Sequence, residues 1–395
     1  MWFRTLLLFV TAFLWSLTLW MATHTSEKLD VLSRYSNSYF VLLASLLVVS
    51  IIFTIFQFGA TYRWIHGKRH NFSMLFFSIV LSFGLAELFI RMLDPIGISY
   101  YEHAKNYHLD KVADDEMYYR HQPNLERDYQ GVSVQTNALG FRDKPILDKQ
   151  PDELRIMFLG DSVTFGWGVR QEDIFVRRAG EILEERLRRP VRTINTGVGS
   201  YNTDNQDAAL RRYGPMLEPD MVVLTYVSND IDPTPEKEFD PWSSYDFRGK
   251  SPPQVFQLIV GKSWTYRLIL HVAQFRQGAI EANLSKSSEG WKQSVSALRS
   301  ISDYCHSKGI PFITIMYRTT PNQLADEIAQ ELRILSAKTG FYYTDALPWF
   351  DSRDIHLLTN SIVDSHPNAQ GHALLAEGIV DFLQQNGLSG VDSLH

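Results

Sequence analysis

The sequence predicts an α/β protein, a parallel sheet covered by helices on both faces, preceded by about three transmembrane helices. Two observations favour the sheet. From Arg155 onward, short apolar runs alternate with amphipathic stretches of helical length, which is the pattern of parallel strands joined by helices. The first apolar run is bounded by polar residues and stops at a glycine turn, as expected for a strand buried on both faces. A third observation, that nearly all long apolar runs lie before Leu93, favours a membrane anchor.

Length and charge limit the classes of function. At 395 residues the chain has room for more than one module. The net charge of −6 and the isoelectric point near 6.1 argue against a nucleic-acid partner. The single cysteine, Cys305, excludes an internal disulfide and a metal site built from several thiolates, and we expect it to be a small apolar residue of a helix. No cluster has usable metal-ligand spacing, so we expect neither a metal nor a cofactor.

The first 98 residues are predicted to be a membrane anchor. Crossing a bilayer takes roughly 20 apolar residues, and three runs approach that length. The first run could be a signal peptide, but its charged start is only Arg4 and no small-x-small cleavage site follows it, so we expect an uncleaved helix. The three predicted spans are about Thr5–Ala22, Tyr39–Ala60 and Phe72–Leu93.

Basic residues in the short loops predict the orientation of these spans. The loop Thr61–Asn71 holds three basic residues and no acid, whereas the loop Thr23–Ser38 balances two basic residues against two acids. By the positive-inside rule the loop Thr61–Asn71 is cytoplasmic. Everything after Leu93 then lies outside the cytoplasm, which predicts a multi-pass protein of the inner or plasma membrane with an extracytoplasmic soluble part.

Residues 99–150 are predicted to be an irregular flanking segment, because they are polar and aromatic without a clear period. Val132–Thr136 has the composition of a short strand. Thr136–Pro145, with the sequence TNALGFRDKP, has turn chemistry, and we expect it to pack on the main domain.

Residues 151–395 are predicted to form the main soluble domain. The expected ends of its helices are set by charged first and last turns, by glycines and by prolines. Pro190 is expected to stop the helix that begins near Glu172, and Gly214 to close the helix that begins near Asp204. The expected strands are Ile156–Leu159, Val191–Asn195, Met221–Tyr226, Pro311–Met316 and Phe341–Thr344. The expected helices are Glu172–Arg188, Asp204–Tyr213, Trp291–Lys308, Gln323–Thr339 and Asn368–Gln385.

A long insertion at about 232–289 interrupts this alternation. It contains Pro233, Pro235, Pro252 and Pro253 and an apolar patch, Val255–Val272. Connections of this length in a compact domain are usually functional, so we expect a lid over the site. Packing of the apolar patch against the membrane is the alternative.

Ser162 is a candidate nucleophile because it stands in Gly160-Asp161-Ser162, directly beyond the carboxyl end of the first strand, where open α/β sheets bind ligands. The other interpretation is that Asp161 and Ser162 are only turn and cap residues. The stretch is not a phosphate-binding P-loop, because the pattern G-x-x-x-x-G-K-[ST] is absent. It is also not the G-x-S-x-G turn of α/β-hydrolases, because Thr164 stands in place of the second glycine.

Other strand ends supply the remaining groups that acyl transfer requires. The second strand leads into the small-residue turn Gly197–Ser200, the third into Asn229, and the loop before the last helix carries Asp364 and His366. A serine hydroxyl needs a base to take its proton, an acid beside the histidine fixes its tautomer, and the oxyanion needs N–H donors. Each residue alone has an ordinary turn or loop role, but their joint position at one sheet edge favours a catalytic site.

These residues, in this order and spacing, resemble the SGNH (GDSL) hydrolase superfamily. The resemblance covers roughly Arg155–Leu383 and rests on four blocks: Gly160-Asp161-Ser162, Asn195–Asn202, Asn229-Asp230 and Asp364–His366–Pro367. It implies a flavodoxin-like three-layer α/β/α sandwich and serine ester chemistry. It also implies that Ser162 is the nucleophile, that His366 is the general base oriented by Asp364, and that Ser162, Gly199, Ser200 and Asn229 line the oxyanion hole.

Three positions depart from the family pattern. Ser200 stands where the family has its second-block glycine. Serine still provides a backbone N–H as an oxyanion donor, but the conformation of the turn can differ. Val227 replaces the glycine two residues before the third-block asparagine, which narrows the pocket. Asp364 precedes His366 by two residues, where three is more frequent.

The leading function is a membrane-anchored serine esterase that hydrolyses an O-acyl group, an acetyl ester on an envelope glycan being the favoured substrate. One alternative is an O-acyltransferase, which would use the same residues and a membrane partner that supplies the acyl group. The other is a non-catalytic binding or scaffold protein that kept the fold. The expected partners are therefore an acylated carbohydrate or other ester, and no nucleic acid.

Overall fold

The computed structural model describes residues 2–23, 37–233, 263–269, 288–351 and 353–388. The chain divides into two compact units, Met1–Leu88 and Phe89–His395. Most of the insertion at 232–289 lies outside the described residues, and so do most residues of the apolar patch Val255–Val272. A short helix at 264–269 is the described part. The expected lid therefore stays a prediction.

The N-terminal unit is helical. The number of three spans predicted from the sequence is too high, because within the described residues only α4 is long and apolar enough to cross a membrane. The predicted span Tyr39–Ala60 does not form one helix: the chain bends by 86° between α2 and α3, and Gly59 has a left-handed φ of +54°. In the described part of the chain, the bent pair of α2 and α3 is the candidate for a second span. The helices are α1 (Trp2–Thr23), α2 (Asn37–Ile55), α3 (Gly59–Gly67) and α4 (Arg69–Leu93).

The predicted loop Thr61–Asn71 is also helical, since it falls on α3 and the start of α4. Lys68 and Arg69 therefore lie at the junction of these two helices, and Arg63 lies within α3. Polar contacts between side chains join α1 to α2 and to Gln57, which follows α2. These are Thr18 Oγ1 with Ser50 Oγ at 2.9 Å, Trp15 Nε1 to Thr54 Oγ1 at 2.8 Å and Gln57 Nε2 to Thr11 Oγ1 at 2.8 Å.

A five-stranded parallel sheet forms the centre of the second unit, as predicted. Its spatial order is β6-β5-β7-β8-β9, so the first strand of the sheet, β5, lies between the second and third. This is the flavodoxin-like order, in which ligands bind where the strand order reverses. The strands are β5 (Leu154–Gly160), β6 (Val191–Asn195), β7 (Met221–Tyr226), β8 (Phe312–Met316) and β9 (Tyr342–Asp345).

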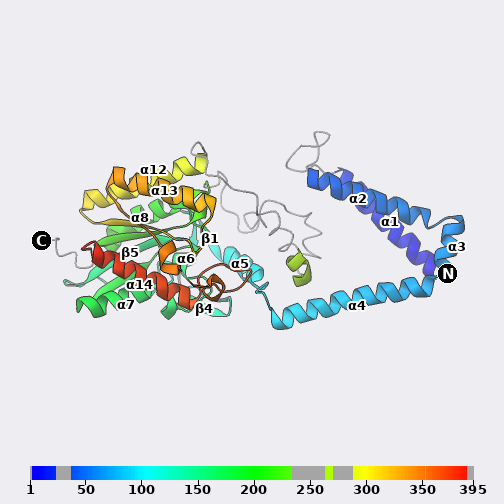
Figure 1. Ribbon diagram of the computed structural model, residues 1–395, viewed down its shortest axis with the longest axis horizontal. Helices are drawn as coiled ribbons and strands as arrows, with labels where there is room; N and C mark the ends of the chain where they lie inside the picture. Colours follow the sequence, from blue (N-terminus) through cyan, green and yellow to red (C-terminus); the bar gives the residue numbers. More distant parts are fainter. Residues whose placement is uncertain (1, 24–36, 234–262, 270–287, 352, 389–395) are drawn as a thin grey trace. The chain divides into compact units, whose positions relative to one another are not determined.

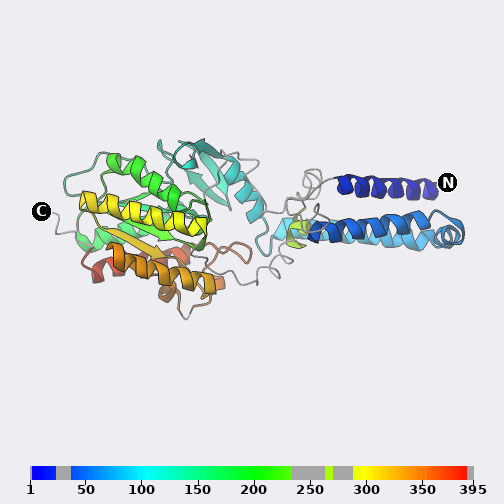
Figure 2. The same ribbon diagram turned by 90° about the horizontal axis from the view of Figure 1, so that it is seen from above.

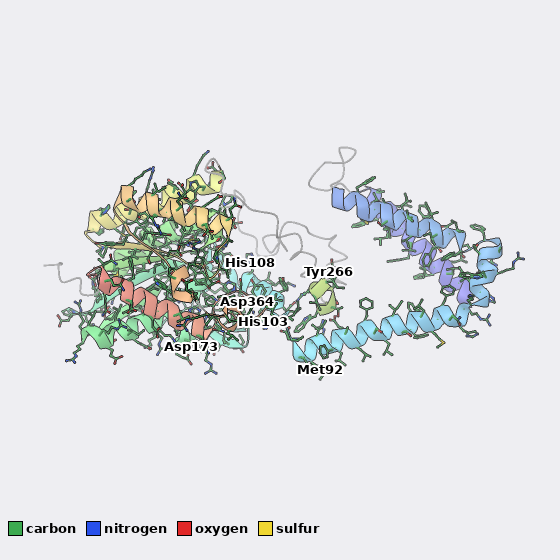
Figure 3. All side chains as sticks on the ribbon, viewed as in Figure 1. Met92, His103, His108, Asp173, Tyr266 and Asp364 are labelled. Atoms are coloured by element: carbon green, nitrogen blue, oxygen red, sulfur yellow. The ribbon has the colours of Figure 1, made fainter. Side chains whose placement is uncertain are left out.

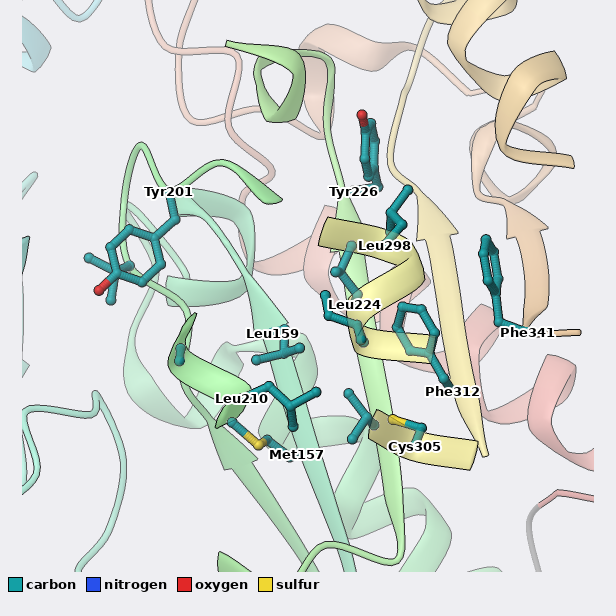
Figure 4. Packing of buried hydrophobic residues seen from close by; sticks show 14 of the residues in the cluster. Met157, Leu159, Tyr201, Leu210, Leu224, Tyr226, Leu298, Cys305, Phe312 and Phe341 are labelled. Carbon is teal, nitrogen blue, oxygen red and sulfur yellow. The ribbon is translucent and has the colours of Figure 1, made fainter. Parts of the chain in front are cut away.

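Helices cover both faces of the sheet (Figure 1; Figure 2). Alternate residues of β5 point to opposite faces: Met157 and Leu159 join one buried cluster, Ile156 and Phe158 the other. Figure 4 shows the first cluster, which includes Cys305 as a buried residue of a helix, as expected. One face carries α8 (Thr203–Leu217), α12 (Glu289–Lys308) and α13 (Gln323–Thr339), the other α7 (Phe175–Leu187) and α14 (Ala369–Gln385).

The prediction that Gly214 closes α8 is wrong, because the helix continues through Gly214 and Pro215 to Leu217. Gly214 serves packing instead. A Cβ at this position would lie 2.6 Å from Tyr304 Oη on α12, so glycine lets the two helices approach. Glu218, in a left-handed conformation, caps the helix.

The flanking segment 99–150, expected to be irregular, begins with a helix and two antiparallel hairpins. The helix is α5 (Tyr100–Leu109). β1 (Lys111–Asp114) pairs with β2 (Tyr118–His121), and β3 (Glu126–Tyr129) pairs with β4 (Val132–Gln135), the strand suggested by the sequence. Met117, Tyr119 and Phe141 from this segment are buried in the same cluster as β5 and β7, so the segment belongs to the core of the second unit.

Candidate active site

Ser162 lies directly beyond the carboxyl end of β5, as predicted. Gly160 allows this turn because a Cβ there would lie 2.1 Å from Thr164 Oγ1. The carboxylate of Asp161 caps the short helix α6 (Ser162–Phe165) by accepting a hydrogen bond of 2.9 Å from the N–H of Val163. The serine is therefore the first residue of a helix, with its side chain half-buried at the sheet edge.

The side chains of Ser162 and His366 meet although they are 204 positions apart. His366 Nε2 lies 2.8 Å from Ser162 Oγ. Asp161 Oδ2 lies 3.1 Å from the same hydroxyl. The Ser162 hydroxyl has one proton, which it can donate either to His366 Nε2 or to Asp161 Oδ2. The contact to His366 is the shorter of the two.

Asp364 holds the other side of the imidazole. Its Oδ1 lies 2.5 Å from His366 Nδ1 and also accepts from the backbone N–H of His366 at 3.1 Å. A carboxylate only accepts, so Nδ1 carries the proton and Nε2 presents its lone pair to Ser162 in the neutral ring. The second oxygen of Asp364, a buried residue labelled in Figure 3, accepts from Gln130 Nε2 at 3.0 Å and from Asn360 Nδ2 at 3.1 Å.

Burial and charge act in opposite directions on His366. Burial disfavours the imidazolium and would lower the pKa, but the hydrogen bond and negative charge of Asp364 outweigh it, so the pKa of His366 is raised above its ordinary value. Burial also raises the pKa of the Asp161 carboxyl. A histidine with these contacts can accept a proton from the serine hydroxyl and hold it as a stabilised imidazolium.

Asn229 follows the third strand of the sheet, in the 3₁₀ turn η2 (Ser228–Ile231). Its side chain is exposed and its Nδ2 lies 3.5 Å from Asp161 Oδ2, the oxygen that also contacts Ser162. The asparagine amide is thus close to the Ser162 side chain. Asp230, buried behind it, fixes the turn by accepting from the N–H of Val227 at 2.6 Å.

Gly199 and Ser200, the other predicted oxyanion-hole residues, differ in what their N–H groups do. The N–H of Gly199 donates to Tyr107 Oη at 2.7 Å, so this donor is already engaged. Ser200 is exposed, with a left-handed φ of +66°, and its N–H has no hydrogen-bond partner among the described residues. Asn195 Nδ2 donates to the carbonyl of Thr164 at 2.8 Å, which ties the strand before this turn to α6.

A family model for GDSL-like lipases and acylhydrolases matches residues 158–374, more than half of the chain. The matched region contains the serine, asparagine, aspartate and histidine described above. The chain belongs to the GDSL-like lipase/acylhydrolase family. It is therefore an enzyme of the class that hydrolyses ester bonds, and the resemblance seen in the sequence is confirmed.

Solved structures that match this GDSL-family chain do so at low identity and with TM-scores below 0.5. A search among curated proteins finds no match. Identities of this size do not identify a substrate. One of the solved structures is a catalytic mutant of an acetylxylan esterase from Geobacillus stearothermophilus, with 15% identity, a TM-score of 0.37, and a match that covers 58% of this chain and 92% of that chain. Another is a two-domain esterase active on acetylated mannans, with 15% identity, a TM-score of 0.38, and a match that covers 61% of this chain and 50% of that chain. A third is a lipolytic protein of the G-D-S-L family from Desulfitobacterium hafniense, with 14% identity, a TM-score of 0.36, and a match that covers 58% of this chain and 98% of that chain.

The segment before the family-matched region supplies residues that sequence reasoning missed. Tyr107 on α5 accepts from Gly199 and lies 2.6 Å from His121 Nε2. His121 Nδ1 donates to the carbonyl of Gly140 at 3.1 Å, and burial lowers the pKa of His121 to about 3, so the neutral ring accepts the hydroxyl proton of Tyr107. Lys111 on β1 donates to the carbonyl of Gly199 at 2.6 Å.

The TNALGFRDKP motif also reaches the GDSL loop. The guanidinium of Arg142 is fully buried and donates to the carbonyls of Phe165, Gly166 and Val169, at 3.3, 2.5 and 2.7 Å. Asp143 accepts from the N–H of Asn195 at 2.9 Å. The motif therefore packs on the main domain, as predicted, and holds both the end of α6 and the end of β6.

Within the described ranges, no group of three or more histidine, cysteine, aspartate or glutamate side chains is arranged to hold a metal ion.

Proposed function

We propose that this enzyme is a membrane-anchored serine esterase that cleaves an O-acyl ester with Ser162, His366 and Asp364. The observation that carries the proposal is the continuous contact from Ser162 Oγ to His366 Nε2 at 2.8 Å and from His366 Nδ1 to Asp364 Oδ1 at 2.5 Å. Both are hydrogen-bond distances, which is the arrangement that a base needs in order to activate a serine hydroxyl.

In the proposed reaction His366 Nε2 takes the hydroxyl proton while Ser162 Oγ attacks the ester carbonyl carbon. The carbonyl oxygen becomes an oxyanion, for which the Ser162 and Ser200 N–H groups and the Asn229 amide are the proposed donors. The tetrahedral intermediate collapses, the alcohol leaves with the proton from Nε2, and an acyl-serine remains. Water then repeats the sequence, releasing the free acid and restoring the hydroxyl.

We propose a short acyl group, such as acetyl, on a glycan. Two aromatic rings lie beside the imidazole of His366: the ring centroids of Tyr100 and Trp167 are 6.2 and 6.3 Å from its own. Trp167 is buried and fills space next to the site, which favours a small acyl group. Tyr100 is half-buried and offers an aromatic face on which a sugar ring can pack.

We also propose that the anchor places the site outside the cytoplasm. Large apolar side chains of α4 such as Met74, Phe77 and Leu81 are more than 60% exposed, as suits a helix in lipid. Lys68 and Arg69 lie at the start of this helix, and by the positive-inside rule that end is cytoplasmic. The chain after Leu93 would then be extracytoplasmic.

A fluorophosphonate probe tests the nucleophile, because it labels an activated serine. The full chain in detergent should be labelled, and Ser162→Ala should not. Labelling that persists in the variant would show that another residue reacts. Incubation with an acetylated oligosaccharide and a free glycan then separates two products: free acetate is expected for an esterase, and acetate transferred to the glycan would indicate an acyltransferase instead.

A further inference from the structure

Lys111 is a buried lysine beside the proposed oxyanion turn. Only 2% of its surface is exposed, and its ammonium donates to the carbonyl of Gly199 at 2.6 Å. The rings of Tyr119 and Tyr107 lie 4.1 and 4.9 Å from Nζ, measured to their centroids, so the charge sits against two aromatic faces. Burial lowers the pKa of Lys111 to about 7, although the negative charge of Asp161 acts in the other direction.

The bond to Gly199 bears on the neighbouring N–H, because the Gly199 carbonyl and the Ser200 N–H belong to the same peptide group. A trans peptide is planar, and its C=O and N–H point in opposite directions. A cation that fixes the carbonyl therefore also fixes the direction of the N–H, which points away from Lys111. In the ammonium form, which predominates below pH 7 because the pKa of Lys111 is about 7, the bond to the carbonyl is charge-assisted. Such a bond also polarises the peptide and strengthens the N–H as a donor.

Neighbouring contacts leave the turn little freedom. Tyr107 accepts from the Gly199 N–H at 2.7 Å, and Tyr119 Oη donates to the Ser200 carbonyl at 2.7 Å. Ser200 has a left-handed φ of +66°, which is unfavourable for a serine. Burying an ammonium without a bonded carboxylate is unfavourable too. The left-handed serine and the buried ammonium are both energetically unfavourable, and both lie at the Gly199–Ser200 peptide. Their coincidence suggests that the position of this peptide matters for function.

We propose that Lys111 is a positioning residue that orients and polarises the Gly199–Ser200 peptide so that the Ser200 N–H stabilises the oxyanion. The inference rests on the proposed ester hydrolysis at Ser162. It assigns a role in the reaction to a residue that lies 47 positions before the family-matched region begins at residue 158. Lys111 acts through the peptide and does not touch the substrate.

Lys111→Met tests the proposal, because methionine keeps the length and removes both donor and charge. Removing a buried charge is tolerated by many folds, and Tyr119 Oη stays 3.3 Å from the Gly199 carbonyl. Lys111→Gln, which keeps a donor without the charge, is the second variant should the first fail to fold. Lys149→Met is the matched control: Lys149 also donates to a carbonyl, that of Glu218 at 2.9 Å, but binds Asp220 and contacts none of the proposed site residues.

Turnover of p-nitrophenyl acetate and the rate of fluorophosphonate labelling are measured on the full chain in detergent, with a melting curve for each variant. We expect kcat of Lys111→Met to fall about 10- to 100-fold, with KM nearly unchanged and labelling slowed in parallel, since losing one oxyanion donor costs about 10²–10³ in rate. The kcat of Lys111→Gln should lie between those of Lys111→Met and the wild type. The kcat of Lys149→Met should equal that of the wild type.

Two results overturn the inference while leaving the esterase proposal in place. One is an active wild type whose Lys111→Met variant keeps kcat within about twofold. The other is a fall in kcat that Lys149→Met reproduces, which would indicate a general loss of stability. A wild type that neither turns over ester nor reacts with the probe would instead contradict the proposed function itself.

Discussion

Gln130 Nε2 lies 3.0 Å from Asp364 Oδ2, although the two residues are 234 positions apart. Gln130 occupies the turn between β3 and β4 with a left-handed φ of +53°, and it precedes the family-matched region. Together with Asn360 it satisfies the carboxylate oxygen that does not face His366. The hairpin β3–β4 thus helps to hold the acid that orients the histidine.

Gln130→Leu should lower kcat about tenfold to a hundredfold. A hydrogen bond to a charged group contributes about 1.5–3 kcal/mol, and its loss leaves Asn360 as the remaining side-chain donor to Asp364 Oδ2. Steady-state kinetics on an aryl acetate measure the effect. Gln135→Leu is the control on the same hairpin, because Gln135 is exposed and donates only to Glu126. Equal losses in both variants would show that the hairpin as a whole, and not this bond, matters.

The pH profile should report His366. Its raised pKa means that the protonated ring stabilises the fold below about 6.5 and that this contribution is lost as the pH rises through the folded value. The proposed base must be neutral, so kcat/KM should rise with pH and reach half its maximum above pH 6.5. In Asp364→Asn burial remains while the counter-charge is lost, so the midpoint should fall and kcat should drop by about 10⁴. An unchanged midpoint in the variant would mean that another group titrates.

Asn229→Ala should lower kcat by about 10²–10³ with little change in KM, because the amide is proposed to bind the oxyanion and not the ground-state ester. The kcat and KM values for a short aryl ester measure this split. A loss confined to KM would remove Asn229 from the oxyanion hole. Ser228→Ala is the neighbouring control, since no role is assigned to its half-buried side chain.

Arg142→Met should destabilise the second unit by about 2–5 kcal/mol. The substitution leaves the buried carbonyls of Phe165 and Val169 without this donor, whereas the carbonyl of Gly166 still accepts from the N–H of Val169 at 3.3 Å. Each unsatisfied group costs about 1–3 kcal/mol. Denaturant unfolding of the full chain, followed by tryptophan fluorescence, measures the loss. Arg127→Met is the control, because the side chain of Arg127 is 56% exposed and its pairing with Asp110 should matter little. A loss of less than 1 kcal/mol in the free energy of unfolding would show that water donates to these carbonyls in place of the guanidinium.

The central sheet and the position of Ser162 beyond β5 were predictable from local signals. The pairing of Ser162 with His366 also required the family resemblance, because His366 lies 21 residues after β9 ends at Asp345. The strands Val191–Asn195 and Met221–Tyr226 and the helix Gln323–Thr339 have the same bounds in the structure, because polar or turn residues bracket each apolar run. Parallel strands bring their carboxyl ends to one edge, so residues that follow them meet there. This rule needs only the order of the elements along the chain.

The contacts from the flanking segment were not predictable in this way. Tyr107 binds the N–H of Gly199 and Lys111 binds its carbonyl, 92 and 88 positions later in the chain. Such distant pairs leave no period or spacing in the sequence. The predicted helix end at Gly214 is wrong because, in a sequence, a glycine required for packing against Tyr304 cannot be distinguished from a capping glycine. The bend after α2 was missed for a similar reason, since the apolar composition continues through it.

Integration of the segment 99–150 into the core has a practical consequence for anyone preparing a soluble version of this enzyme. A truncated form starting at residue 151, where sequence analysis places the domain boundary, would lose the side chains that hold the Gly199 carbonyl and the Asp364 carboxylate. It would also uncover the apolar surface now covered by Met117, Tyr119 and Phe141, inviting aggregation. Expression should therefore begin before Asp94, so that both hairpins, the buried Ile98 and the backbone bond from Val363 to Ile96 are retained.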